Sequence, residues 1–158
     1  MISKAMQDAI NDQINKELFS SYLYLSMSAF FEAQSLGGMA KWLRGQADEE
    51  REHAMKFYDH LLERGGKVEL KAIAAPATEW KSAMAVFEEV QAHEALVTAS
   101  IYALYETALK EKDYPAQVLL QWYITEQVEE EKNAAEIVDS FKRIEAHDSV
   151  TLILAHTL

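Results

Sequence analysis

The sequence predicts an all-α protein, an antiparallel four-helix bundle with one long crossover. Its 158 residues include only five glycines and two prolines, and four of the glycines form pairs at 37–38 and 65–66. Between these breaks, apolar residues recur about every 3.5 residues, as in helices that bury one face. The length fits one domain with its own core, so we expect residues 1–158 to form a single domain.

The breaks and the apolar periodicity predict four long helices and a fifth, short one. We expect them at about 4–34, 39–64, 80–110, 114–144 and 148–158. A glycine pair separates the first two helices, and a tight link around Pro115 separates the third from the fourth. Short links of this kind predict two antiparallel hairpins.

The segment 65–79 is too long for a turn. About fifteen extended residues reach about 50 Å, whereas a helix of about 26 residues is about 39 Å long. We therefore expect this segment to cross the whole bundle and to make the second and third helices parallel. It carries Val68, Leu70 and Ile73 among polar residues, a pattern that leaves two interpretations open, strand-like pairing against a neighbour or simple packing on the bundle.

Charge and composition restrict the partners of the chain. A formal net charge of -11 repels nucleic-acid phosphates and anionic lipid headgroups, so we expect neither nucleic acid nor membrane as a partner, and cations instead. The chain has no cysteine, which excludes disulfides and thiolate metal sites and fits a reducing compartment. The N-terminal residues lack the apolar run of a signal peptide. We expect a cytoplasmic protein.

A carboxylate interrupts the apolar stripe of each long helix near its middle. The four acids, one for each helix, are Glu17, Glu50, Glu94 and Glu130. His53 follows Glu50 by three residues, a spacing that lets an imidazole and a carboxylate lean toward the same point. Gln127 precedes Glu130 by three residues and lies on the same stripe.

A single acid on such a stripe is ordinarily a solvated charge, but four together require another explanation. Neighbouring carboxylates at about 4 Å repel by about 4 kcal/mol per pair at an effective dielectric near 20. Two divalent cations would neutralise the four charges of the helix acids, and His53 would add a neutral nitrogen ligand. Oxygen ligands with one imidazole and no sulfur suit iron or manganese and tolerate zinc.

The residues around these acids resemble the ferroxidase centre of prokaryotic, non-haem ferritins. The likeness covers nearly the whole chain, and the runs that carry it are Glu49-Glu50-Arg51-Glu52-His53, Gln127-Val128-Glu129-Glu130, Tyr22-Leu23-Tyr24-Leu25-Ser26-Met27, Glu63-Arg64-Gly65-Gly66 and Gln121-Trp122-Tyr123, with Glu17 and Glu94. The ligand plan is also that of the ferritin-like di-iron bundles in general. The resemblance implies a ferritin-like fold and a homo-oligomeric cage of twenty-four subunits, which oxidises Fe(II) with dioxygen and stores the ferric product.

The resemblance also implies roles for the site residues. Glu17, Glu50 and His53 would hold the first iron. Glu94 and Glu130 would hold the second, with Glu50 as the bridge and Gln127 beside it. Because the last long helix offers no histidine at the position of a second Glu-x-x-His, we expect the second iron to be held more weakly.

Further residues near the centre have two interpretations each. Tyr24 lies seven residues after Glu17 on the same stripe, where its hydroxyl would orient a ligand or supply an electron, unless the ring only packs. Trp122 is a second redox-capable ring or another packing residue. Matching positions in the family form a third iron site with Glu130, although they also fit a solvated acidic face; they are Glu49, Glu126 and Glu129. We interpret the other histidines as ordinary polar residues: His60, His93, His147 and His156.

Related families differ at identifiable positions. Bacterioferritins carry a haem-ligating methionine where this chain has Arg51, and a histidine in the last long helix where this chain has Glu130, so we expect no haem. Rubrerythrin-like peroxidases need cysteines, which are absent. The segment Ser149–Leu158 resembles the short apolar helix that lines the fourfold axes of the cage. Two other functions stay open, a non-catalytic scaffold that binds divalent ions loosely and a di-iron oxidase of an organic substrate.

Overall fold

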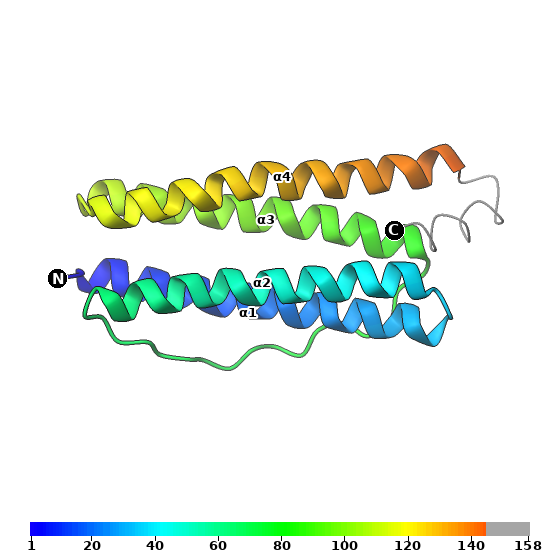
Figure 1. Ribbon diagram of the computed structural model, residues 1–158, viewed down its shortest axis with the longest axis horizontal. Helices are drawn as coiled ribbons and strands as arrows, with labels where there is room; N and C mark the ends of the chain where they lie inside the picture. The colour runs from blue at the N-terminus through cyan, green and yellow to red at the C-terminus, as the bar shows by residue number, and fades with distance from the viewer. Residues whose placement is uncertain (145–158) are drawn as a thin grey trace.

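The structure is a computed structural model that describes residues 1–144, and these residues form two antiparallel helical hairpins (Figure 1). The helices are α1 (Lys4–Ala33), α2 (Gly37–Glu63), α3 (Ala83–Lys110) and α4 (Tyr114–Ile144). The crossover runs along the bundle from the end of α2 to the start of α3, so these two helices are parallel (Figure 1). The predicted four-helix bundle is confirmed, and the fifth helix at 148–158 lies outside the described residues.

The helices α1, α2 and α3 all end in a left-handed residue that redirects the chain. At the end of α2, Gly65 has φ 74° and donates to Leu62 O at 3.0 Å, while Gly66 donates to Leu61 O at 2.8 Å. Ser35 (φ 59°) and Lys112 (φ 52°) are in the same conformation. Each of them, together with the residue after it, donates the same pair of backbone hydrogen bonds to the end of its helix. Glycine takes this conformation at little cost, whereas serine and lysine are held in it by the surrounding bonds.

Two helix starts differ from the sequence-based expectation for the same local reason, the position of the turn or cap. Since Ser35 takes the left-handed turn, the glycine pair is free to be helical, and α2 begins at Gly37 rather than at residue 39. The third helix begins at Ala83 rather than near 80, because the Ser82 hydroxyl accepts from the Ala85 amide at 3.0 Å and caps it.

The crossover packs on α1 without forming a strand. Asn11 of α1 donates to Lys67 O at 2.9 Å and accepts from the Glu69 amide at 2.9 Å. Farther along, the Ser26 hydroxyl donates to Ala77 O at 2.6 Å. Side chains of α1 thus satisfy backbone groups that a neighbouring strand would otherwise bond. Of the three apolar residues of the crossover, Val68 packs against the bundle, whereas Leu70 and Ile73 are exposed. Pairing of this segment with a neighbour stays a prediction.

The core consists of two apolar clusters, one toward each end of the bundle. One cluster centres on Tyr24, Phe31 and Phe87, and the other on Ile10, Phe57 and Leu120. Between them lies a layer of buried polar side chains, namely Glu17, Glu50, His53, Glu94, Gln127 and Glu130. This polar layer holds the predicted site residues.

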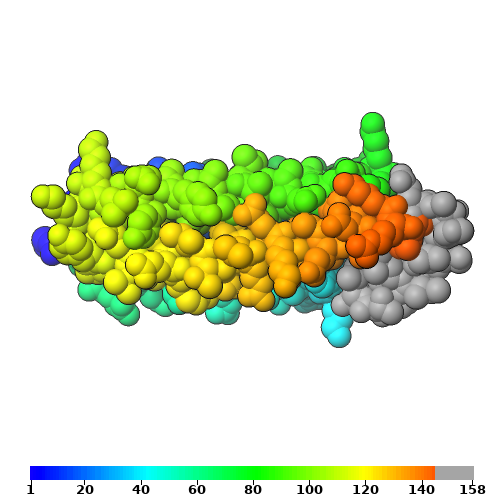
Figure 2. All heavy atoms as spheres, turned by 90° about the horizontal axis from the view of Figure 1, so that it is seen from above, coloured from blue at the N-terminus to red at the C-terminus, as the bar shows by residue number. Residues whose placement is uncertain are grey.

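The four helices are not equally spaced. Within residues 1–144, Cα atoms of α1 and α2, of α3 and α4, and of α1 and α3 approach within 8 Å, whereas those of α2 and α4 do not. Viewed from above, α3 and α4 lie side by side along one face of an elongated rod (Figure 2). None of the described helices combines the length and apolar character needed to cross a bilayer.

An ion pair joins the two hairpins at one end of the bundle. Arg64, just after α2, donates to Asp113 Oδ1 at 2.9 Å and to Asp113 Oδ2 at 3.2 Å. Asp113 precedes α4 and also accepts from the Ala116 amide at 3.0 Å, so it caps that helix. The Arg64 guanidinium and the Ala116 amide hold the pKa of the Asp113 carboxyl below its usual range, against the effect of burial.

We predict that Asp113→Ala lowers the free energy of unfolding by about 1–3 kcal/mol, because it removes both the cap and the partner of Arg64. Asp113→Asn keeps an acceptor for the cap and should lose less. Urea denaturation of the metal-free chain measures both variants. Equal losses in the two variants would show that the cap contributes nothing beyond the ion pair.

Candidate metal centre

The centre takes one carboxylate from the middle of each helix. Glu17 comes from α1, Glu50 from α2, Glu94 from α3 and Glu130 from α4, and their exposed fractions are 1%, 0%, 1% and 6%. Each acid occupies a core position of its helix because the apolar residues before and after it on the same stripe are buried. The four acids predicted from the sequence therefore converge in the polar layer of the core.

With His53, these acids form two groups that could each hold a metal ion, and Glu50 belongs to both; we call them the metal-binding groups. The ligand atoms of Glu17, Glu50 and His53 lie within 4.8 Å of one another, and so do those of Glu50, Glu94 and Glu130. His53 Nδ1 lies 3.4 Å from Glu50 Oε2 and 3.9 Å from Glu17 Oε2. A shared carboxylate between two groups is the arrangement that bridges a pair of cations.

Several carboxylate oxygens of the centre lack a hydrogen-bond donor. Among the described residues, the buried side-chain atoms without a partner are Glu17 Oε2, both oxygens of Glu50, and Asn15 Oδ1. A buried carboxylate without donors is costly, because nothing replaces the water it has lost. Divalent cations would supply the missing partner, so the donor set fits a metal pair.

Burial and mutual repulsion raise the proton affinity of these carboxyls when no cation is bound. Burial raises the pKa of Glu50 well above its usual range, and the charges of Glu17 and Glu94 raise it further. Burial, with Glu94 and Glu49 adding repulsion, raises the pKa of Glu130 to about 9. The metal-free centre therefore holds protons at neutral pH, and cations must displace them to bind.

Two side chains fix Glu94 on the α3 side of the centre. The Tyr24 hydroxyl donates to Glu94 Oε1 at 2.5 Å, and the Gln127 amide donates to Glu94 Oε2 at 3.1 Å. Burial and the charge of Glu94 hold the pKa of Tyr24 well above its usual value, so the phenol stays protonated as a donor. Of the two interpretations of Tyr24, the geometry fits a residue that orients a ligand. Gln127 acts likewise through its amide nitrogen.

Three residues that were not predicted from the sequence form hydrogen bonds with the ligands or with the residues beside them. Gln13 donates to Glu17 Oε1 at 3.1 Å, Thr98 accepts from Gln127 at 3.0 Å, and the Tyr123 hydroxyl donates to the backbone oxygen of His53 at 2.6 Å. Gln13 and Thr98 each lie four residues from a ligand on the same helix, a spacing that identifies neighbours on one helix face. Tyr123 bonds across helices, which no spacing reveals.

The three acids expected at a third iron position differ in how closely they approach the centre. Ligand atoms of Glu126, half-buried, lie within 4.8 Å of those of His53 and Glu130 and form a third group with them. Glu49 is exposed but interacts with Glu130. Glu129 is exposed and belongs to none of the metal-binding groups found in residues 1–144. Glu126 is thus the flanking acid most directly connected to the centre.

Trp122 lies at the outer edge of the centre. Its ring meets that of His53 edge-on at 5.4 Å, and the Lys56 ammonium lies 3.9 Å from the Trp122 ring centroid. With 39% of its surface exposed, Trp122 shields His53 from solvent on one side. The Tyr123 ring, stacked on Phe57 at 3.9 Å, closes the core beneath it.

Fold and site together define a metal-binding four-helix bundle in which carboxylates dominate the ligand set. Comparison with known proteins narrows this class. Residues 7–144 match the family model of the ferritin-like domain. The chain is 43% identical over 143 residues to the bacterial non-heme ferritin of Bacteroides fragilis, covering 90% of each chain, and 42% identical over 147 residues to that of Campylobacter jejuni, covering 93% of this chain and 88% of the other.

Solved structures agree with this result. An open pore ferritin from the archaeon Archaeoglobus fulgidus superposes with a TM-score of 0.96 at 46% sequence identity, over 98% of this chain and 94% of that one. The chain belongs to the ferritin-like domain family, and the resemblance noted in its sequence to the non-haem ferritins is confirmed.

The raised pKa of Glu130 leads to a pH-dependent stability. Between its usual value of 4.5 and about 9, the folded metal-free chain keeps a proton that the unfolded chain releases. The free energy of unfolding should therefore fall as pH rises through this window, and Glu130→Gln, which cannot ionise, should flatten the dependence.

Urea denaturation of the metal-free chain between about pH 5 and about pH 9 measures this effect. Glu88→Gln, at an exposed position of α3, is the matched control and should keep the original slope. A Glu130→Gln variant as steep as the control would contradict the assignment.

Proposed function

We propose that this protein is an iron-storage ferritin subunit with ferroxidase activity. It binds two Fe(II) ions in the polar layer, oxidises them with dioxygen, and passes the Fe(III) to a mineral held inside an oligomeric cage. The observation that carries the proposal is the pair of metal-binding groups joined by Glu50, whose two oxygens lack any other partner in the described residues. Family membership supports iron as the cation.

In this proposal the two iron positions are unequal. Glu17, Glu50 and His53 bind the first ion, and Glu50, Glu94 and Glu130 bind the second. Only the first position has its own imidazole close to its carboxylates, since His53 Nδ1 lies on the side of Glu17 and Glu50. The second position is held by carboxylates alone, and its Glu94 is fixed by hydrogen bonds. An ion at this second position is easier to release, which suits a centre that iron passes through.

The protein contributes position and charge to the oxidation. Each Fe(II) gives one electron to the same dioxygen molecule, which is thereby reduced by two electrons while two Fe(III) form. Carboxylate ligands stabilise the higher positive charge of the product ions. Tyr24 keeps Glu94 oriented throughout. Because it is buried and its hydroxyl bonds a ligand directly, Tyr24 can also supply an additional electron.

A third iron position adjoins the pair. Glu126 and Glu130 hold it in this proposal, with Glu49 beside them and His53 on the side of the centre. Glu129 is exposed on the same turn of α4 and would bind this iron only after its side chain adopts a different rotamer. Iron at this position lies between the centre and solvent, where the oxidised ion leaves.

The comparisons support an oligomeric cage, and the composition supports a location for it. Proteins named ferritins cover 88% to 98% of this chain, and we propose that it assembles, as the resemblance implies, into a hollow homo-oligomer of twenty-four subunits. The lack of cysteine suits a reducing compartment, and the cytoplasm is the proposed location.

Anaerobic addition of Fe(II) followed by oxygen tests the ferroxidase. We expect two Fe(II) bound per chain, the second more weakly than the first, and a rapid rise of Fe(III) absorbance on mixing with oxygen. Glu17→Ala and Glu94→Ala should each lower this rate by about 10²-fold or more, as expected for the loss of a group that positions the reacting metals.

Glu88→Ala serves as the matched control, because Glu88 is an exposed acid on the same helix as Glu94, and it should keep the full rate. Oxidation no faster than in buffer alone would leave a scaffold that binds cations loosely. Rapid oxidation with no accumulation of iron beyond the centre would instead identify an oxidase of another substrate.

Light scattering coupled to size exclusion tests the cage. We expect one species with twenty-four times the mass of a single chain, and this species should retain iron after loading with a large excess over its oxidation centres. A monomer or dimer under all salt concentrations would contradict the storage proposal while leaving the oxidation chemistry intact.

A further inference from the structure

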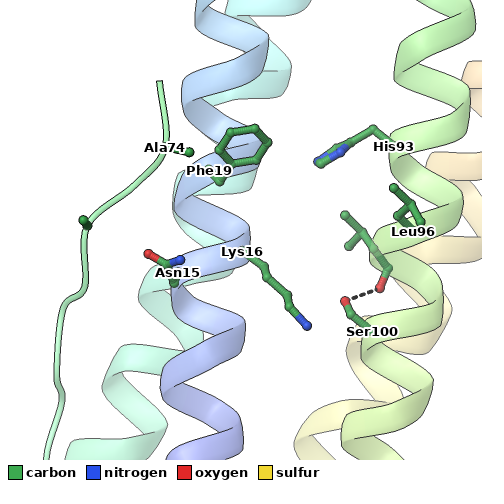
Figure 3. A pocket seen from close by; sticks show the side chains of 9 residues that line it. Asn15, Lys16, Phe19, Ala74, His93, Leu96 and Ser100 are labelled. Atoms are coloured by element: carbon green, nitrogen blue, oxygen red, sulfur yellow. Dashed lines mark hydrogen bonds between the residues drawn. The ribbon is translucent and has the colours of Figure 1, made fainter. Parts of the chain in front are cut away.

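A cavity that is open to solvent lies on the α1–α3 side of the bundle, and its lining includes none of the residues that could hold a metal ion. It has a volume of about 490 Å³ and is bounded by α1, α3 and the crossover (Figure 3). Phe19 and Asn15 line it from α1, Leu96 from α3, and Ala74 from the crossover. A volume of this size has room for several water-sized molecules.

The cavity shares a wall with the metal centre. Lys16 and His93, which line it, immediately precede Glu17 and Glu94 in the chain. The amide of the buried Gln13 donates both to Glu17 Oε1 and to Ser100 Oγ, each at 3.1 Å, and Ser100 lines the cavity. One side chain therefore reaches from a metal ligand to the cavity.

His93 completes this wall. Its Nε2 lies 2.7 Å from the hydroxyl of the fully buried Ser20, and its ring meets Tyr24 edge-on at 5.8 Å. Tyr24 in turn donates to Glu94. One buried side chain behind the lining, Gln13 or Tyr24, therefore connects the wall of the cavity to each of these two ligands.

The lining disfavours cations and suits a small apolar molecule. Of the nine lining residues, only Lys16 is permanently charged, and none is acidic. A ferrous ion would be repelled by Lys16, whereas the largely apolar lining leaves room for a small uncharged molecule.

The opposite side of the bundle, between α2 and α4, carries acidic side chains near the centre. Glu126 is partly exposed there, with 28% of its side chain accessible, and one of its oxygens lies 3.8 Å from His53 Nε2. Glu49 is exposed and interacts with Glu130. Acids at this α2–α4 side attract Fe(II), so the two substrates of the proposed reaction meet different surfaces.

We propose that the α1–α3 cavity is the entrance through which dioxygen reaches the metal centre, between Gln13 and His93. This inference rests on the proposed ferroxidase function. It assigns to the crossover a part in the reaction, since Ala72 and Ala74 form the outer wall of the entrance. Iron enters instead from the acidic α2–α4 side.

Filling the cavity from its exposed walls tests the proposal. Ala74→Trp acts from the crossover and Leu96→Trp from α3, and both positions are exposed, so neither change disturbs the buried core. Ala75→Trp is the matched control, because Ala75 is exposed next to Ala74 but does not line the cavity. Initial oxidation rates are measured at two Fe(II) per chain over a range of dissolved oxygen.

We expect kcat/KM for dioxygen to fall by about threefold to tenfold in both cavity-filling variants, because oxygen must then cross close-packed protein. The rate at saturating oxygen and the anaerobic binding of Fe(II) should be unchanged. Variants with the oxygen dependence of Ala75→Trp would overturn the proposal. Failure of the unmodified chain to bind Fe(II), seen before oxygen is added, would instead refute the proposed function.

Crystals of the unmodified chain under xenon pressure give a measurement that needs no variant. Xenon bound between Phe19 and Leu96 is the expected result, since xenon reports sites that apolar gases occupy. A cavity without xenon would overturn the proposal.

Discussion

Four carboxylates buried at the same level of a helix bundle are the constraint on which the rest of this structure depends. Glu17, Glu50, Glu94 and Glu130 are almost fully enclosed, and a pair of such charges at about 4 Å repels by about 4 kcal/mol even at an effective dielectric near 20. Only protons or cations relieve this repulsion. The two apolar clusters at the ends of the bundle hold the helices together while the layer between them stays polar. Stability is thus supplied away from the centre, which leaves the centre free to bind and release ions.

The hydrogen bonds around the centre are distributed unevenly. Glu94 accepts from both Tyr24 and Gln127, and Glu17 accepts from Gln13, whereas neither oxygen of Glu50 has a donor among the described residues. The acid shared by the two groups is therefore the one that needs cations most. Acids fixed by donors keep their orientation without a cation. In the proposed function, this arrangement would preserve the geometry of the site between successive loads of metal.

Opposite sides of the bundle offer different surroundings to the two substrates proposed for it. On the α2–α4 side, the backbones stand farther apart and acids reach the surface beside His53. On the α1–α3 side, the backbones approach closely and the crossover covers a cavity without acidic lining. This difference follows from the connectivity, because the crossover packs along α1 and encloses space next to that helix. A bundle with short links alone would have no such cover.

The sequence by itself determined the helices, the hairpins, the crossover and the five central ligand candidates. Helical periodicity places residues on one face of one helix, so an acid on each apolar stripe is visible without a structure.

Three features needed the tertiary structure. Turns at Ser35 and Lys112 adopt left-handed backbone that neither residue favours alone, so the hydrogen bonds of the folded chain decide them. Tyr123 supports His53 from another helix, and Glu126 rather than Glu129 joins the centre, because helix rotation and spacing are set by packing between helices. The cavity is formed by three segments distant in sequence, and no pattern within any one of them records what the other two enclose.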